Sequence, residues 1–199
     1  MNQDSAEFAI VDAVGHGMSA VMMSVAAINS LRNARREGLD LNTAYENTGK
    51  VIETQFGPDC FVTAQLGSLA LESGELTWLN AGHPLPLLVR DGSYTRELVC
   101  RPSMPMGLGG PVAEIATEKL QPGDRVLFYT DGVTDTRAQG GERFGIPRLA
   151  DYLVRATLDG VSPAETVRRL CASIIRHNGG SNLSDDATLL LIEYRGTPH

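Results

Sequence analysis

The order of helix-like and strand-like segments limits the fold of this chain more than any other feature of its sequence. A short apolar run at residues 8–11 indicates a buried strand, and the periodic segments at 18–36 and 41–56 indicate two helices. Two more helices are expected at 146–158 and 163–177. Further segments have strand patterning, at 61–71, 75–79, 85–90, 94–99, 112–119, 125–129 and 187–194. Helix pairs around a block of strands predict an α+β fold, with sheets in the middle and helices outside.

Turn and cap residues mark the borders of these segments. Asn42 or Thr43 is the expected N-cap of the second helix, and Ser162 that of the last helix. Asp91 and Gly92 suit the turn of a hairpin between two of the strands.

Composition excludes several classes of protein. The chain has 199 residues, 42% apolar and 21% charged, which suits one globular domain over residues 1–199. Its net charge of −7 argues against nucleic acid or an anionic membrane as the main partner. No apolar run reaches the roughly 18 residues of a membrane span. Cys60, Cys100 and Cys171 show no CxxC spacing, so free thiols in a cytoplasmic protein are favoured over a disulfide or zinc site.

Acidic residues stand at the ends of three apolar strands. Asp12 follows the first strand, Asp131 follows the strand at 125–129, and Asp185 with Asp186 precedes the last. A carboxylate at such a place is costly to desolvate unless something neutralises it. If the strands are neighbours the carboxylates cluster, and an all-oxygen set suits Mg²⁺ or Mn²⁺. The alternative is that each Asp only forms a turn.

Several short motifs occur in order along the chain. Asp12 opens DAVGHG and Asn80 opens NAGHP. The other motifs are PMGL, LQPGD, YTDGV, FG and DDAT, which begin at Pro105, Leu120, Tyr129, Phe144 and Asp185. Together, over residues 8–193, they resemble the SpoIIE/RsbU-type bacterial branch of the PPM (PP2C-like) serine/threonine phosphatases.

The resemblance implies a fold, a cofactor and a set of ligands. The expected fold is a PP2C-like αββα four-layer sandwich of two antiparallel sheets flanked by helix pairs. The expected cofactor is a binuclear Mn²⁺ or Mg²⁺ centre that activates water for phosphoester hydrolysis. By motif, Asp12 would bridge the metals, the Ala13 carbonyl would be a further ligand, and Asp131 and Asp185 would complete one metal's ligands. Asp186 would have a supporting role.

Two histidines lie within the motifs. His16 has two open interpretations: it donates a proton to the leaving serine or threonine oxygen, or it braces the turn between two glycines. His83 is interpreted as a structural histidine that orients a hairpin.

The chain departs from the family pattern at its start. Relatives carry a GGDxxD-like strand upstream of the segment that begins here at Phe8, and seven residues precede Phe8. We therefore expect that the first strand and one metal ligand are missing, either by truncation, or through a misassigned start codon, or because the protein is a deficient relative. The open sheet edge would favour pairing, for example as a homodimer. A catalytically deficient pseudo-phosphatase that acts as a binding module is the competing hypothesis.

The resemblance also implies partners. The substrate would be a phosphorylated STAS-type anti-sigma-factor antagonist, dephosphorylated at serine or threonine. An upstream sensory domain in the full-length protein would act through the two helices at 18–56, which would set metal affinity.

Overall fold

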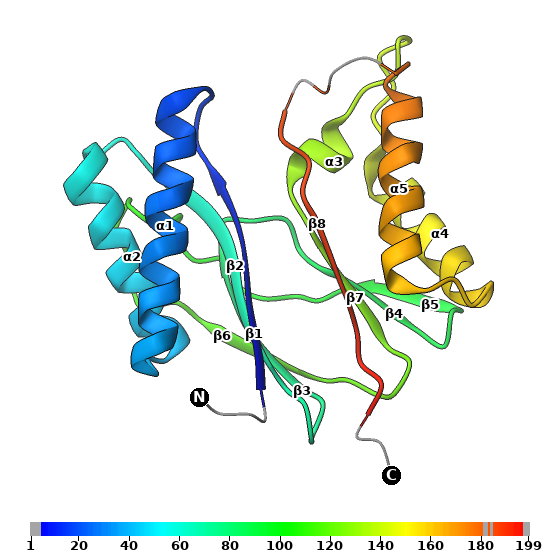
Figure 1. Cartoon of the computed structure of the whole chain (residues 1–199), viewed down its shortest axis with the longest axis horizontal. Coiled ribbons are helices and arrows are strands. Elements are labelled where there is room, and N and C mark those ends of the chain that lie inside the picture. Colours follow the sequence, from blue (N-terminus) through cyan, green and yellow to red (C-terminus); the bar gives the residue numbers. More distant parts are fainter. Residues whose placement is uncertain (1–4, 181–182, 184, 197–199) are drawn as a thin grey trace. The chain divides into compact units, whose positions relative to one another are not determined.

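The structure, a computed structural model, describes residues 5–180, 183 and 185–196, and the chain divides into two units (Figure 1). The first unit comprises Met1–His83 and Val99–Lys119, and the second comprises Pro84–Leu98 and Leu120–His199. Each unit contains one four-stranded antiparallel sheet and a pair of long helices. Among the described residues, no helix has the length and apolar character needed to cross a bilayer.

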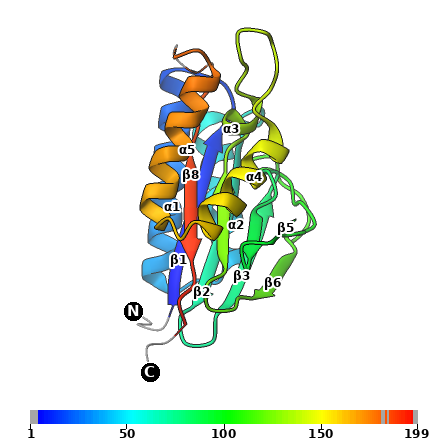
Figure 2. The same ribbon diagram turned by 90° about the vertical axis from the view of Figure 1, so that its right-hand side faces the viewer.

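The sheet of the first unit has the strand order β1-β2-β3-β6, and each neighbouring pair is antiparallel. Its strands are β1 (Ser5–Ala13), β2 (Val62–Ala70), β3 (Glu75–Ala81) and β6 (Ile115–Lys119). The helices α1 (Met18–Glu37) and α2 (Leu41–Phe56) lie together along one face of this sheet, as Figures 1 and 2 show. Side chains from the helices and from alternate strand positions form the core of the unit, including Met23, Ala27, Ile52, Val62, Ala64, Leu66 and Leu79.

The ends of the two helices follow from local chemistry. Gly38 ends α1 in the left-handed conformation, with φ 70°, which glycine adopts without steric cost. The N-cap of α2 is Asp40, whose carboxylate accepts a hydrogen bond from the Thr43 backbone N–H at 2.9 Å. The prediction of Asn42 or Thr43 as this cap was therefore wrong, because Asp40 already satisfies the exposed amide of the first turn.

The sheet of the second unit has the order β5-β4-β7-β8, again antiparallel throughout. Its strands are β4 (Leu87–Arg90), β5 (Tyr94–Glu97), β7 (Arg125–Tyr129) and β8 (Leu189–Glu193). The helices α4 (Gly145–Leu158) and α5 (Pro163–His177) pack on it (Figure 2). The core joins strand and helix residues, including Leu87, Val89, Leu127, Tyr129, Leu149, Leu153, Leu170 and Ile174.

The predicted α+β class, with two antiparallel sheets and flanking helix pairs, is confirmed. The hairpin at Asp91–Gly92 is present, with positive φ at both residues, and Ser162 caps α5 by accepting from the Glu165 N–H at 3.4 Å. A five-residue helix, α3 (Asp131–Asp135), was not predicted. Strand β6 begins at Ile115 rather than at residue 112.

Candidate functional site

Asp131 and Asp185 lie at the same end of two neighbouring strands of the second unit. Strand β7 pairs with β8 in antiparallel register, and the last matched residues are Tyr129 and Leu189. Asp131 follows β7 as the first residue of α3, and Asp185 lies just before β8 on the adjoining segment. Both residues are exposed. The expectation that neighbouring strands bring acidic segments together holds for these two strands.

Thr130 connects these two segments. Its hydroxyl donates to the Asp186 carbonyl at 3.0 Å and accepts from the Thr188 N–H at 2.9 Å. Its own N–H donates to the Thr188 carbonyl at 3.2 Å. The side chain is buried. The turn that carries Asp131 is thereby tied to the segment that carries Asp185 and Asp186.

Gly132 and Asp186 approach each other closely on the same side of the site. A Cβ atom added at Gly132 would lie 2.3 Å from the Asp186 carbonyl oxygen, a distance that no side chain tolerates. The glycine that follows Asp131 in the YTDGV motif is therefore required on steric grounds. The Asp185 carboxylate in turn accepts a hydrogen bond from the Asp186 N–H through Oδ1 at 2.8 Å, which restrains its orientation.

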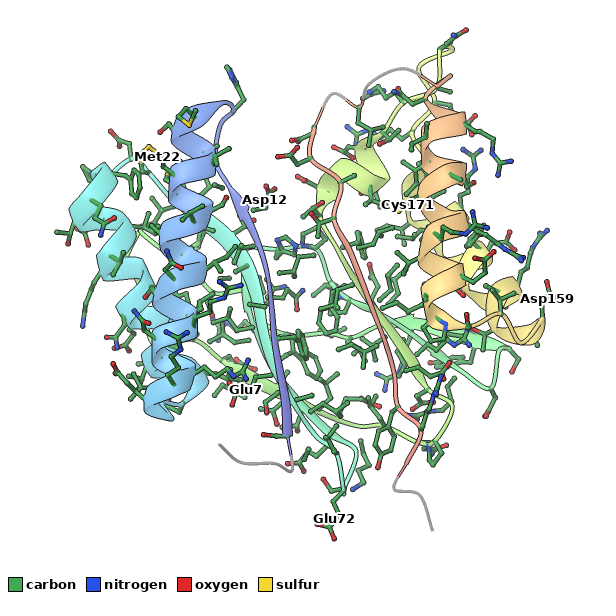
Figure 3. All side chains as sticks on the ribbon, in the orientation of Figure 1. Glu7, Asp12, Met22, Glu72, Asp159 and Cys171 are labelled. Carbon is green, nitrogen blue, oxygen red and sulfur yellow. The ribbon has the colours of Figure 1, made fainter. Side chains whose placement is uncertain are left out.

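Asp12 belongs to the first unit, near the end of β1. It is matched with Thr63 of β2, and its carbonyl accepts from the Thr63 hydroxyl at 3.3 Å. Val11 and Ala13 pack against the helix-facing core, so the Asp12 side chain lies on the other face of the strand, away from α1 (Figure 3). Ala13 is the last residue of β1 and is matched with Val62.

His16 lies exposed in the turn between β1 and α1. The flanking Gly15 and Gly17 have φ of 91° and 76°, so the turn depends on glycine at both positions. The described part of the chain offers the His16 ring no hydrogen-bond partner. Both interpretations of His16, as proton donor and as brace, remain predictions.

The NAGHP motif forms a loop that is closed by two hydrogen bonds from one side chain to the backbone. The Asn80 side chain accepts from the His83 N–H at 2.7 Å and donates to the His83 carbonyl at 2.9 Å. The loop sets His83 Nδ1 3.1 Å from the Thr63 hydroxyl, which also contacts the Asp12 carbonyl. His83 thus has the structural surroundings that the sequence predicted. Thr63 was missed, because no motif marks it.

Two other motifs have structural roles. In LQPGD, the buried Asp124 accepts from the Gln121 N–H at 2.8 Å and from Arg90 Nη2 at 2.6 Å. In PMGL, Met106 exchanges two backbone hydrogen bonds with Val62, both 2.9 Å long. These motif residues hold turns and strand ends, and none of them supplies a chemical group to the carboxylate segments.

Tyr129, the last residue of β7, is buried two residues before Asp131. Burial, reinforced by the charge of Glu97, raises the pKa of Tyr129 to about 12, so this phenol stays neutral at physiological pH. Its hydroxyl has no hydrogen-bond partner in the described residues. His, Cys, Asp and Glu side chains of the described residues form no group of three that could hold a metal ion.

Comparison with known proteins shows the family. Residues 2–195 match the family model described as "Stage II sporulation protein E (SpoIIE)". Protein IcfG of Synechocystis is 31% identical over 147 residues, which are 73% of this chain and 23% of IcfG. Phosphoserine phosphatase RsbU of Bacillus subtilis is 21% identical over 194 residues, which are 96% of this chain and 56% of RsbU. The chain thus spans about a quarter to just over half of the curated relatives that it matches.

Solved structures share the fold. The RsbU and RsbW domains of Rv1364c from Mycobacterium tuberculosis match with TM-score 0.80 and 29% identity, over 98% of this chain and 55% of that one. The catalytic domain of the serine/threonine phosphatase PstP, solved in complex with 2 manganese ions, matches with TM-score 0.66 and 16% identity, over 96% of this chain and 90% of that one. The second likeness concerns the fold alone.

Proposed function

The chain belongs to the SpoIIE family of PP2C-like serine/threonine phosphatases, and from this premise we propose that it hydrolyses phosphoserine or phosphothreonine on a regulatory protein with the help of bound Mn²⁺ or Mg²⁺. The observation that carries the proposal is the pairing of the Asp131 and Asp185 segments at one end of β7 and β8. Carboxylates that come together on adjoining segments would repel each other, and a divalent cation would relieve that repulsion.

The exposure of two acidic side chains supports the binding of such an ion. Asp131 and Asp185 are exposed, so their oxygens are accessible, and the Asp185 carboxylate keeps one oxygen on the Asp186 N–H. We propose Asp12, the Ala13 carbonyl, Asp131 and Asp185 as the ligands, with Asp186 in support. An oxygen-only set selects Mg²⁺ or Mn²⁺ over zinc. When bound, the ions would supply positive charge and activate the attacking water.

A side chain of this protein would supply the proton that the leaving serine or threonine oxygen needs. As water attacks phosphorus, a new phosphorus–oxygen bond forms and the water gives up one proton to the solvent. The bond from phosphorus to the serine oxygen breaks, and its electron pair passes to that oxygen. The oxygen then needs a proton, and we assign the donor role to a ring nitrogen of His16. The exposure of His16 and its lack of a partner in the described residues support this assignment. The carboxylates would serve to bind and orient.

The proposed substrate is a STAS-type anti-sigma-factor antagonist phosphorylated on serine. The name of RsbU, a phosphoserine phosphatase that aligns with 96% of this chain, supports a phosphoserine substrate. Because the chain covers only 56% of RsbU, the substrate of the whole protein is itself part of this proposal.

Regulation through α1 and α2 is the second part of the proposal. Helix α1 exposes four large apolar side chains near its start, with Met18 at 75% exposure and Val21, Met22 and Val25 at more than half. Apolar surface gathered in this way marks contact sites. We propose that an upstream sensory domain contacts this face. Substitutions in α1 or α2 that change neither Mn²⁺ affinity nor turnover would contradict this part.

The test of the function is phosphate release from a serine-phosphorylated STAS protein, measured with Mn²⁺ and with EDTA. We expect release that needs Mn²⁺, is lost in Asp131→Asn and persists in Asp159→Asn, an exposed residue with the same change of charge. Binding of the phosphoprotein without release, in the unsubstituted chain, would favour the pseudo-phosphatase instead.

A further inference from the structure

We propose that Thr130 is a positioning residue, which fixes the spacing between the Asp131 turn and the Asp185–Asp186 segment and thereby sets metal affinity. This inference rests on the proposed function, because it takes Asp131 and Asp185 as metal ligands. Thr130 itself would not touch the metal or the substrate.

The hydroxyl of Thr130 makes two hydrogen bonds, both to the segment that enters β8. It donates its single proton to the Asp186 carbonyl at 3.0 Å, and a lone pair accepts from the Thr188 N–H at 2.9 Å. Both partners are backbone atoms of the segment that enters β8. One side chain therefore ties together the ends of two strands that are far apart in sequence.

These bonds lie beyond the regular strand pairing. The ladder between β7 and β8 ends at Tyr129 and Leu189, so both carboxylates stand outside it. Past the ladder, two features of Thr130 continue the connection: the two hydrogen bonds of its hydroxyl, and the hydrogen bond that its N–H donates to the Thr188 carbonyl. Asp131 is one peptide from Thr130, and Asp185 is one peptide from Asp186. A shift at Thr130 would therefore pass directly to both carboxylates.

Loss of the Thr130 hydroxyl would affect both of the segments that it connects. Thr130 is 1% exposed, so a substitution that removes its hydroxyl would leave the Asp186 carbonyl and the Thr188 N–H without this partner, and both groups belong to exposed residues. Gly132 already touches the Asp186 carbonyl from the other segment, so the contact is close-packed. Without the hydroxyl, nothing in Thr130's side chain would hold the Asp131 turn at its present spacing from the Asp185–Asp186 segment. Outer-shell partners of metal ligands typically change metal affinity by about 10–100-fold when mutated.

The variants are chosen to separate positioning from stability. Thr130→Val keeps the shape and removes both hydrogen bonds, whereas Thr130→Ser keeps the hydroxyl. Thr166→Val is the matched control: Thr166 is also 1% exposed, lies in the same unit, and donates its hydroxyl proton to the Ser162 carbonyl at 2.9 Å. Thr166 belongs to α5 and contacts none of the carboxylate segments in the hydrogen bonds described.

The experiment measures Mn²⁺ affinity by titration calorimetry and the Mn²⁺-induced rise in Tm for the full chain. We expect Thr130→Val to weaken Mn²⁺ binding by about tenfold or more, Thr130→Ser to stay within about threefold, and Thr166→Val to bind as the unsubstituted chain does. Thr130→Val and Thr166→Val should both lower the metal-free Tm, but only Thr130→Val should shrink the Mn²⁺-induced rise. If Thr130→Val does not fold, Thr130→Cys replaces it, because the thiol is a weak donor. The same Mn²⁺ affinity and Tm measurements then apply to that variant.

Two outcomes would overturn the inference, and they differ. If the unsubstituted chain binds Mn²⁺ and Thr130→Val binds it equally well, the positioning role is wrong and the proposed function stands. If the unsubstituted chain does not bind Mn²⁺ at all, both the positioning role and the proposed metal site are wrong.

Discussion

Asn80 holds the backbone of His83 from both sides, with its Oδ1 2.7 Å from the His83 nitrogen and its Nδ2 2.9 Å from the His83 carbonyl oxygen. A side-chain amide is the one group that can both accept and donate in this arrangement at the same size. The NAGHP motif thus encodes a loop geometry that brings His83 to Thr63. The pairing of β1 with β2 separately sets the Thr63 hydroxyl against the carbonyl of Asp12.

Asn80→Asp should destabilise the chain. The carboxylate keeps the bond from the His83 N–H but places an oxygen against the His83 carbonyl, in a buried position. An unsatisfied buried polar group costs roughly 1–3 kcal/mol. Urea unfolding should show a loss of this size, whereas Asn33→Asp, on the exposed side of α1, should change little. Equal stability of the two variants would contradict a stabilising role for the Asn80 hydrogen bonds.

Two buried tyrosines should respond differently to loss of the hydroxyl. Tyr129 has no partner for its hydroxyl in the described residues, so Tyr129→Phe should leave the free energy of unfolding unchanged or raise it. Tyr45 donates to the Met104 carbonyl at 2.7 Å, so Tyr45→Phe should cost about 1 kcal/mol. Denaturant unfolding at neutral pH compares them, and a clear loss in Tyr129→Phe would reveal a partner for that hydroxyl.

Gly132→Ala should damage both stability and metal binding. The new methyl group would lie 2.3 Å from the Asp186 carbonyl oxygen, so the two carboxylate segments would have to move apart. Overpacking of this kind costs about 1–3 kcal/mol. Gly140→Ala is the control, because a Cβ there meets nothing within 4 Å. Thermal unfolding with and without Mn²⁺ measures both effects, and a Gly132→Ala chain that matched Gly140→Ala would refute the close contact.

Glu165 should make the stability depend on acid pH. Hydrogen bonds from Arg168 and then Arg169 lower the pKa of Glu165 from its usual 4.5 to about 2. The unfolded chain therefore takes up this proton first as the pH falls, so the stabilisation is complete above about pH 4.5 and disappears by about pH 2.

The difference in Tm between the unsubstituted chain and Glu165→Gln should follow that profile. It should be small, because the pair is exposed, and it should shrink in salt. Glu46→Gln, an exposed substitution on α2 with the same change of charge, is the matched control. A Glu165→Gln difference that stayed constant from pH 6 to pH 2 would contradict the assignment.

The helices and buried strands could be predicted because their signals are local. Helix α5 has its cap Ser162, Pro163 and an apolar repeat within one stretch of chain, and its bounds were predicted correctly. Helix α3 was missed because its five residues are too few for an apolar repeat. The α2 cap was misplaced because Asp40, Asn42 and Thr43 are all good capping residues, and only the backbone geometry chooses among them.

The site was predictable only as far as motifs reach. The Asp residues stand at strand ends in the sequence, and the register of β7 with β8 then brings Asp131 and Asp185 into adjacent segments. The contact of Thr63 with Asp12 spans 51 residues, and that of Thr130 with Asp186 spans 56. Such cross-strand contacts depend on pairing register, which a single sequence does not reveal.

The measurement that tests the central claim most directly is Mn²⁺ titration of the unsubstituted chain, Asp131→Asn and Asp159→Asn. Removing a ligand carboxylate should weaken Mn²⁺ binding by about tenfold or more, whereas the same change of charge at the exposed Asp159 should have little effect. Binding by the unsubstituted chain that is lost in Asp131→Asn alone is the predicted result. Equal Mn²⁺ affinity in all three chains would contradict Asp131 as a metal ligand.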